Sequence, residues 1–267
     1  MNSDRTLHGA VRSSHAVAGA PCWVSLSARD LAAAQHFYAA VLGWEWSRAG
    51  HGDRFRLACA DGVPVAGAAE VAGAWQTAVA WTPYFAVADA DEAVSRGKER
   101  GGTPAVGPIA FPSGRAALLA DRDGAVFGVW EGALVAGWEH WRESAPAFVR
   151  LHTRDAFDAA IFYGEVLRWA SGGPGSCEVV YDGDEVVLSN QGDVVARIFS
   201  GALGEAPDPT LRPHWQVVFA VPDVAGRAEA AVAHGGGVVR HDPERGEIIL
   251  SDPDGARFTV TARPARK

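Results

Sequence analysis

The amino-acid sequence repeats itself, and this repeat constrains the fold more than any other feature. Segment 30–44 aligns without a gap with segment 155–169, and both contain an Asp, an Ala, a Phe-Tyr pair, a Val-Leu pair and a final Trp. Two shorter motifs recur in the same order, Phe-Ala-Val-x-Asp at 85–89 and 219–223, and Asp-x-Asp-Gly-Ala-x-Phe at 121–127 and 252–258. The chain therefore consists of two halves built to one plan.

Local patterns assign secondary structure to the repeated unit. Residues 23–27 and 148–152 alternate with the period of two that is typical of a half-buried strand. Asp30 and Asp155 then stand at the N-cap position of a helix, directly before apolar residues at helical spacing. Asp-Gly pairs further on indicate β-hairpins. The prediction is a βαβββ module that occurs four times, near 21–72, 81–132, 146–200 and 213–263.

Charge and composition exclude several classes of partner. The 32 acidic and 24 basic residues give a net charge of −8, which opposes binding to nucleic acid. No run of about 18 apolar residues is present that would span a membrane, and segment 1–17 is too polar for a signal peptide. We therefore expect a cytoplasmic protein without nucleic-acid or membrane partners. Cys22, Cys59 and Cys177 are widely spaced, which favours reduced, packed thiols.

With these motifs the chain resembles the vicinal oxygen chelate superfamily, the group of glyoxalases, bleomycin-resistance proteins and extradiol dioxygenases. The resemblance covers nearly everything after residue 20 and is most specific in segment 30–44 and in the Asp-Pro-Asp-Gly hairpin at 252–255. The chain looks most like two-domain actinobacterial proteins that are sometimes labelled hydroxylases and are linked to aromatic polyketide antibiotic pathways.

The resemblance implies an α+β fold with two vicinal oxygen chelate domains. Each domain combines two βαβββ modules into a cupped mixed sheet with helices outside. The expected boundaries are a flexible leader over 1–20, a first domain over 21–132, a linker over 133–145 and a second domain over 146–263. Trp138 and Trp141 in the linker are expected to dock against a domain.

Metal-dependent members of the superfamily hold one divalent cation with His, Gln and Glu side chains at set strand positions. In this chain the resemblance places those positions at Trp23, Thr82 and Gly128 in the first domain, and at Phe148, Gln216 and Thr259 in the second. Trp, Phe and Gly side chains do not coordinate a hard cation, and Thr and Gln are weak neutral donors. We therefore expect no metal and no other cofactor.

Strand alternation also predicts which side chains face the concave side of each sheet. These candidate ligand-binding residues are Trp23, Ser25, Thr82, Tyr84 and Trp130 in the first domain, and Phe148, Arg150, His152, His214, Gln216 and Thr259 in the second. The aromatic members are either stacking surfaces for a flat ligand or fillers of the concave face. The alternate residues are almost all apolar and are expected to pack against the helices, as are Trp44 and Trp169.

Arg150 and His152 are the candidate catalytic residues, because alternation aims both into one cavity. The alternative is that they bind carboxylates at the domain interface. The leading functional prediction is metal-independent binding of a bulky aromatic natural product, such as a polyketide or anthracycline-like antibiotic or intermediate. Such binding would serve sequestration and self-resistance, or biosynthesis beside a partner enzyme.

Two enzymatic alternatives stay open. One is a metal-free enzyme that acts on such a compound through His152 and Arg150. The other is a metal-dependent glyoxalase-type or dioxygenase-type enzyme with displaced ligands. Whether the protein is an enzyme is left open, with binding favoured, and a monomer and a homodimer are both compatible with the sequence.

Overall fold

The computed structural model describes residues 13–48, 52–135, 147–173, 175–200 and 212–262. Within them the first half forms one eight-stranded mixed sheet in the order β2-β3-β4-β1-β5-β8-β7-β6. Its strands are β1 (Pro21–Ala28), β2 (Glu45–Arg48), β3 (Phe55–Ala60), β4 (Val63–Glu70), β5 (Ala80–Ala86), β6 (Thr103–Phe111), β7 (Gly114–Ala120) and β8 (Val126–Gly132). Two βαβββ modules meet where β1 pairs antiparallel with β5.

The second half repeats this topology in the order β10-β11-β12-β9-β13-β16-β15-β14. Its strands are β9 (Ala147–His152), β10 (Glu178–Asp182), β11 (Glu185–Asn190), β12 (Asp193–Phe199), β13 (His214–Val221), β14 (Gly237–Asp242), β15 (Glu247–Ser251) and β16 (Arg257–Ala262). The α+β fold with two cupped mixed sheets is thereby confirmed.

Each module contributes one longer helix that starts at an Asp N-cap. The helices are α1 (Leu31–Leu42), α3 (Ala90–Glu99), α5 (Ala156–Leu167) and α6 (Val224–Ala233), with the short α2 (Ala72–Trp75) and the 3-10 helix η1 (Ser14–Val17). The side chains of Asp30 and Asp155 accept hydrogen bonds from backbone amides of the first turn, as the sequence predicts. None of the described helices is long and apolar enough to cross a membrane.

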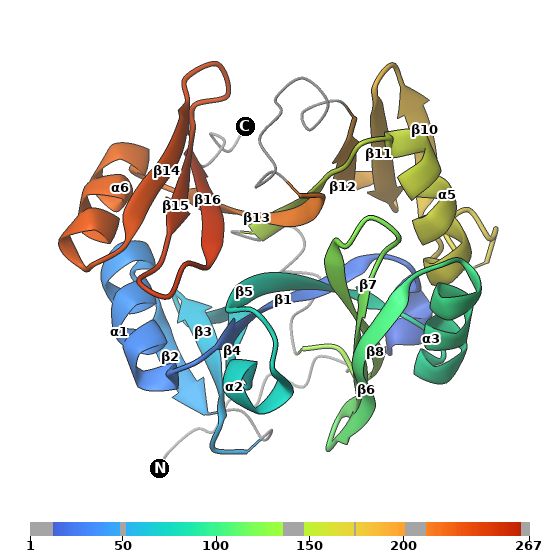
Figure 1. The fold of residues 1–267 in the computed structure, drawn as a ribbon, viewed down its shortest axis with the longest axis horizontal. Coiled ribbons are helices and arrows are strands. Elements are labelled where there is room, and N and C mark those ends of the chain that lie inside the picture. Colours follow the sequence, from blue (N-terminus) through green and yellow to red (C-terminus); the bar gives the residue numbers. More distant parts are fainter. Residues whose placement is uncertain (1–12, 49–51, 136–146, 174, 201–211, 263–267) are drawn as a thin grey trace, which may run out of the picture.

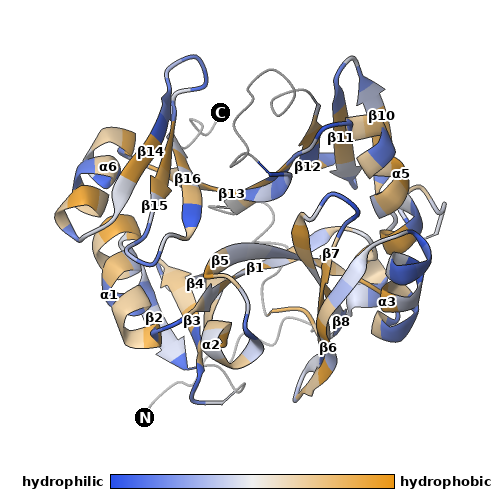
Figure 2. Ribbon diagram, viewed as in Figure 1, coloured by the Kyte–Doolittle hydropathy of each residue, from blue (hydrophilic) through white to orange (hydrophobic). Residues whose placement is uncertain are grey.

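The two halves share one hydrophobic core. Helix α1 lies beside α6 and α3 lies beside α5, so each helix packs with one from the other half (Figure 1). Aromatic rings also meet across the halves: the ring centroids of Phe85 and Trp215 are 5.1 Å apart, and those of Trp44 and Phe219 are 5.0 Å apart. Figure 2 shows hydrophobic residues along the strands of both sheets and hydrophilic residues at the outer hairpin turns.

The strand residues expected to pack against the helices lie in this core. Val24, Leu26, Phe85, Val87, Phe127, Val129, Val149, Leu151, Val217, Phe219, Phe258 and Val260 are all at most 2% exposed. Because side chains alternate across a strand, their neighbours point to the outer, concave face of each sheet. The two sheets therefore stand back to back, and their concave faces open in opposite directions (Figure 1).

The expected flexible leader over 1–20 is wrong for residues 13–20. Val17 is fully buried, the Ser14 hydroxyl donates to the carbonyl oxygen of Val87 at 2.7 Å, and the Trp169 indole donates to the carbonyl oxygen of Gly19 at 2.7 Å. These contacts are made with residues far along the chain, so the local sequence does not reveal them. Residues 1–12, and Trp138 and Trp141 of the linker, lie outside the described residues.

Candidate ligand-binding site

The concave face of the first sheet encloses a cavity of about 340 Å³, which we call the first cup. This volume lies in the range of about 300–1,000 Å³ that is typical of small-molecule sites. The residues that line it are Cys22, Trp23, Ser25, Ser27, Arg54, Phe55, Leu57, Ala69, Val71, Trp75, Tyr84, Phe111, Ser113, Ala116, Trp130, Ala133, Leu134 and Val135. Most of them are apolar or aromatic.

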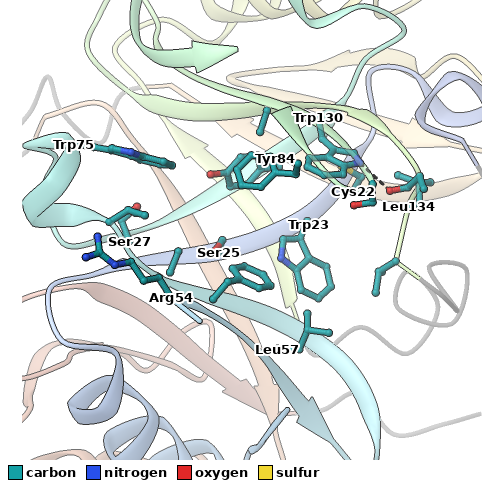
Figure 3. A pocket seen from close by; sticks show the side chains of 18 residues that line it. Cys22, Trp23, Ser25, Ser27, Arg54, Leu57, Trp75, Tyr84, Trp130 and Leu134 are labelled. Atoms are coloured by element: carbon teal, nitrogen blue, oxygen red, sulfur yellow. Dashed lines mark hydrogen bonds between the residues drawn. The ribbon is translucent and has the colours of Figure 1, made fainter. Parts of the chain in front are cut away.

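The aromatic side chains come from elements that are far apart in the sequence. Figure 3 shows Trp75, Tyr84 and Trp130 in a row on one side of the cavity, with Trp23 on the other side. The indole nitrogen of Trp130 donates to the carbonyl oxygen of Ala133 at 3.0 Å, which holds the segment after β8 against the cup. The cavity thus presents several flat rings in fixed orientations.

Glycines make room for these rings. A Cβ atom at Gly67 on β4 would lie 2.7 Å from the ring of Phe55 and 2.9 Å from the indole of Trp23. A Cβ atom at Gly128 on β8 would lie 2.3 Å from the ring of Tyr84. Real Cβ atoms do not approach neighbours this closely. The aromatic rings can therefore occupy these places only because Gly67 and Gly128 have no side chain.

Few polar groups accompany the rings. Ser25 and Ser27 on β1 are buried, and burial, with a smaller contribution from Cys22, raises the pKa of Tyr84. The Tyr84 phenol therefore stays protonated at neutral pH. Among the described residues no group is hydrogen-bonded to its hydroxyl, which leaves an O–H donor available to a ligand. Arg54 is the one charged side chain among the described residues that line the cup.

The second sheet carries long polar side chains on its concave face, where the first sheet carries the aromatic and apolar lining of the first cup. The guanidinium of Arg150 on β9 donates two hydrogen bonds to the carboxylate of Glu247 on β15, at 2.6 and 2.7 Å. Both side chains are at most 10% exposed. The same guanidinium lies over the ring of Phe148, 4.7 Å from its centroid. Arg150 thus binds a carboxylate, as one interpretation of the sequence held, but within its own half.

A second group of hydrogen-bonded side chains lies on this concave face. The Nε2 atom of His152 lies 2.9 Å from Oε1 of Gln216, whose amide nitrogen donates to the hydroxyl of Thr259 at 2.6 Å. Burial lowers the pKa of His152 to about 4, and burial also lowers the pKa of His214. The rings of His152 and His214 stack at 5.4 Å. Both imidazoles are therefore neutral at pH 7.

Strand register shows that the two halves differ at equivalent positions. Ser25 pairs with Thr82 across β1 and β5, as Arg150 pairs with Gln216 across β9 and β13. Gly128 on β8 corresponds to Thr259 on β16, and Ala116 on β7 corresponds to Glu247 on β15. Small residues keep the first cup open, and long polar residues fill the same positions of the second sheet.

Comparisons with known proteins give the family. The anthracycline biosynthesis protein DauV of Streptomyces sp. strain C5 is 33% identical, and the match covers 91% of this chain and 92% of DauV. The protein named "Putative glyoxylase CFP32" of Mycobacterium bovis is 30% identical, over 91% of this chain and 94% of CFP32. The family model for the glyoxalase-like domain matches residues 148–261. The chain belongs to the vicinal oxygen chelate superfamily.

A solved member of the vicinal oxygen chelate superfamily has the same fold. Homoprotocatechuate 2,3-dioxygenase from Brevibacterium fuscum, in complex with 3,4-dihydroxyphenylacetate, superimposes with a TM-score of 0.57. The superposition covers 93% of this chain and 82% of the dioxygenase chain, at 16% sequence identity. The two-domain fold is therefore shared with a dioxygenase, at low sequence identity.

The residues present do not fit the divalent cation of metal-dependent vicinal oxygen chelate proteins. In the first half the Tyr84 ring lies across Gly128, and Thr82 is only 4% exposed. In the second half Gln216 and Thr259 bond to each other. Within the described ranges, no three His, Cys, Asp or Glu side chains come together in a way that could hold a metal ion. The donor set is neutral and weak in both halves.

The structure brings some of the predicted site residues together and separates others. Trp23, Ser25, Tyr84 and Trp130 line the first cup, whereas Thr82 is buried below its surface. The six predicted residues of the second half meet one another or Glu247 through the contacts given above. Nδ1 of His214 also lies 2.9 Å from the carbonyl oxygen of Arg212. The role of all these residues in ligand binding stays a prediction.

Sequence reasoning missed the cup residues that come from other elements. The cup is also lined by Phe55 and Leu57 on β3, Trp75 on α2 and Phe111 on β6. These elements lie outside the strands that carry metal ligands in the superfamily, whose alternation predicts the concave face. Glu247 was also missed. Counting back from the Asp-Gly turn at 254–255 would have placed it on the concave face, opposite Thr261.

Proposed function

We propose that the first cup binds a bulky, planar aromatic compound of the aromatic polyketide kind without the help of a metal. The observation that carries this proposal is the cavity of about 340 Å³ lined by Trp23, Trp75, Tyr84, Phe111 and Trp130. Aromatic rings bind flat molecules by stacking, and a small number of polar groups then set their orientation. The cup offers both kinds of contact.

The relatives support a place in natural-product metabolism. DauV is named as an anthracycline biosynthesis protein. Anthracyclines are built on a flat system of fused rings. On this proposal the protein holds an aromatic antibiotic or intermediate, either to keep it from the cell's own targets or to present it to a biosynthetic enzyme. The apolar lining keeps water away from such a compound and stabilises it in the bound state.

The second half supports the choice of binding over catalysis. A catalytic base works best with a pKa near the working pH, and the pKa of His152 is about 4. Arg150 is already neutralised by Glu247. Gln216 and Thr259 are likewise hydrogen-bonded within this half, so these side chains serve one another as partners. We therefore do not favour an enzyme built on His152 and Arg150.

Ligand titration tests the proposal. The purified protein is titrated with several anthraquinone-type and anthracycline-type compounds while tryptophan fluorescence is followed, and calorimetry confirms each binding curve. We expect saturable quenching at micromolar concentrations and at least tenfold weaker binding by Trp23→Ala, about 1.4 kcal/mol. Trp46→Phe is the matched control, because Trp46 lies on β2 outside the cup and its indole donates to the carbonyl oxygen of Gln35.

Three results would overturn the proposal. One is the absence of binding for every scaffold. Another is binding that Phe148→Ala in the second half abolishes while Trp23→Ala leaves it unchanged. The third is chemical conversion of a bound compound, detected by mass spectrometry, because turnover would identify an enzyme.

A further inference from the structure

The mouth of the first cup carries a positive charge that no part of the described protein neutralises. Arg54 stands in the exposed turn before β3, and its backbone carbonyl oxygen accepts a hydrogen bond from the amide of Glu70 at 2.9 Å. This bond fixes the backbone at the rim. The side chain lines the cavity, where every other described lining residue is uncharged.

The carboxylates nearest to Arg54 in the chain and across the strand pair are engaged elsewhere. Asp53 lies 4.0 Å from the guanidinium of Arg48. Glu70 accepts a hydrogen bond from the amide of Leu31, at the start of α1, at 3.3 Å. Within the described residues no acidic group lies within ion-pair distance of the Arg54 guanidinium. The rim of the cup therefore carries a positive charge in a chain whose net charge is −8.

Arg54 and Tyr84 offer complementary contacts to one kind of ligand. A guanidinium presents five N–H donors in a planar fork that matches a carboxylate, and it also stacks on aromatic rings. The protonated Tyr84 hydroxyl adds a further donor inside the cavity. Figure 3 shows Arg54 and Trp23 on the side of the cavity that faces Tyr84. A flat apolar molecule with an acidic group at one end would satisfy the rings and the guanidinium together.

We propose that Arg54 selects ligands with a carboxylate at the edge of the aromatic system, and that the cup discriminates against cationic aromatic compounds. This inference rests on the proposed function of the first cup and narrows its ligand class. An amine at the same end of the ligand would meet Arg54 as a like charge. The neutral lining offers no acidic side chain to compensate it.

Three compounds on one scaffold test the selection. Anthraquinone-2-carboxylate, its neutral carboxamide and its cationic aminomethyl analogue have the same ring system and differ in charge. We expect the native protein to bind the carboxylate about tenfold more tightly than the carboxamide, and the cation most weakly. This preference should fall as salt is added, because Arg54 is exposed and exposed charges are screened.

Variants assign the preference to one side chain. Arg54→Gln should bind carboxylate and carboxamide equally, and Arg54→Glu should favour the cation. Arg48→Gln removes the same charge from a side chain that is 80% exposed and does not line the cup, so it should keep the native preference. Circular dichroism checks that each variant is folded. We expect all of them to fold, because Arg48 and Arg54 are both exposed.

The outcomes separate this inference from the proposed function. If the native protein binds none of the three compounds or any larger aromatic scaffold, the proposed function fails. If it binds all three with equal affinity, the cup is an aromatic site and the role of Arg54 is wrong. If Arg54→Gln weakens all three compounds equally, Arg54 acts through packing and the charge selection is also wrong.

Discussion

The hydroxyl of Tyr38 on α1 donates a hydrogen bond of 3.1 Å to Asp252, which lies before β16 in the other half of the chain. The indole nitrogen of Trp81 donates to the same hydroxyl at 2.8 Å. A second copy of this arrangement joins Tyr163, Asp121 and Trp215, with both distances 2.9 Å. The repeated Phe-Tyr and Asp-x-Asp-Gly motifs therefore meet across the two halves and fasten them together.

The first prediction concerns this contact. Tyr38→Phe removes the hydroxyl, so Trp81 loses its acceptor and Asp252 loses a donor in a buried place. We expect the free energy of unfolding to fall by about 1–3 kcal/mol. Urea denaturation followed by circular dichroism measures it. Tyr181→Phe is the matched control, because that side chain is 52% exposed. Equal midpoints for the two variants would contradict the prediction.

The second prediction concerns the buried ion pair of the second half. Arg150→Met leaves the Glu247 carboxylate buried without its cation, and we expect this to cost about 3–5 kcal/mol of stability. Adding Glu247→Leu should restore most of the loss, because no buried charge then remains. Arg197→Met removes an arginine from a more exposed pair with Glu185, and should cost at most about 1 kcal/mol. Failure of the double variant to recover would show that the unpaired Glu247 carboxylate is not what destabilises Arg150→Met.

The third prediction concerns the close approach of Gly128 to Tyr84. Gly128→Ala places a methyl group against the Tyr84 ring and forces the ring into the first cup. We expect a loss of about 1–3 kcal/mol in stability and weaker ligand binding. In a Tyr84→Ala background the same substitution should cost much less, because the clash is gone.

Gly164→Ala is the control for this change of residue type. Gly164 lies in α5, and a Cβ atom there would have no neighbour within 4 Å. Alanine should stabilise this helix by about 0.5–1 kcal/mol. A comparable loss of stability at Gly128 in both the native and Tyr84→Ala backgrounds would show that the ring is not the cause.

The fourth prediction concerns pH. Burial lowers the pKa of His152 from 6.5 to about 4, so between these values the unfolded chain binds a proton that the folded chain does not. The free energy of unfolding should therefore fall as pH falls through this window, by about 2–3 kcal/mol in total. The pKa of His214 is lowered as well and acts in the same direction.

Variants isolate the contribution of His152. Urea midpoints at about pH 7.5 and about pH 4.5 should differ less for His152→Gln than for the native protein. The exposed His241 serves as the control, and His241→Gln should keep the native difference. An unchanged difference in His152→Gln would show that other groups cause the loss of stability in acid.

Short-range patterns were enough to predict much of the fold. The Asp N-caps, the alternation on β1 and β9 and the Asp-Gly turns depend on residues close together in the chain, and the structure has each of them. Trp23 and Tyr84 could be placed on the concave face for the same reason. Alternation fixes a side of the sheet wherever one face is apolar.

Long-range contacts account for what could not be predicted. Arg54 lies in a turn without periodicity, and only the packing of β3 against β4 brings it to the rim of the cup. Ser14 is hydrogen-bonded to Val87, which is far away in the sequence. The local sequence around Ser14 does not reveal this contact, so a flexible leader was expected there. Glu247 acquires its partner through the order of strands in the sheet, and the pairing of Tyr38 with Asp252 needs both halves. Patterns of neighbouring residues in the sequence do not predict contacts of this kind.

The core that both halves share makes the chain one cooperative unit. Either half alone would expose the apolar face that now packs against the other, so we expect that neither half folds stably by itself. Local unfolding of an edge strand such as β10 would then cost as much free energy as global unfolding wherever it disturbs that core. A small molecule held under β1 would thus slow proteolysis and hydrogen exchange on the opposite sheet, which it does not touch.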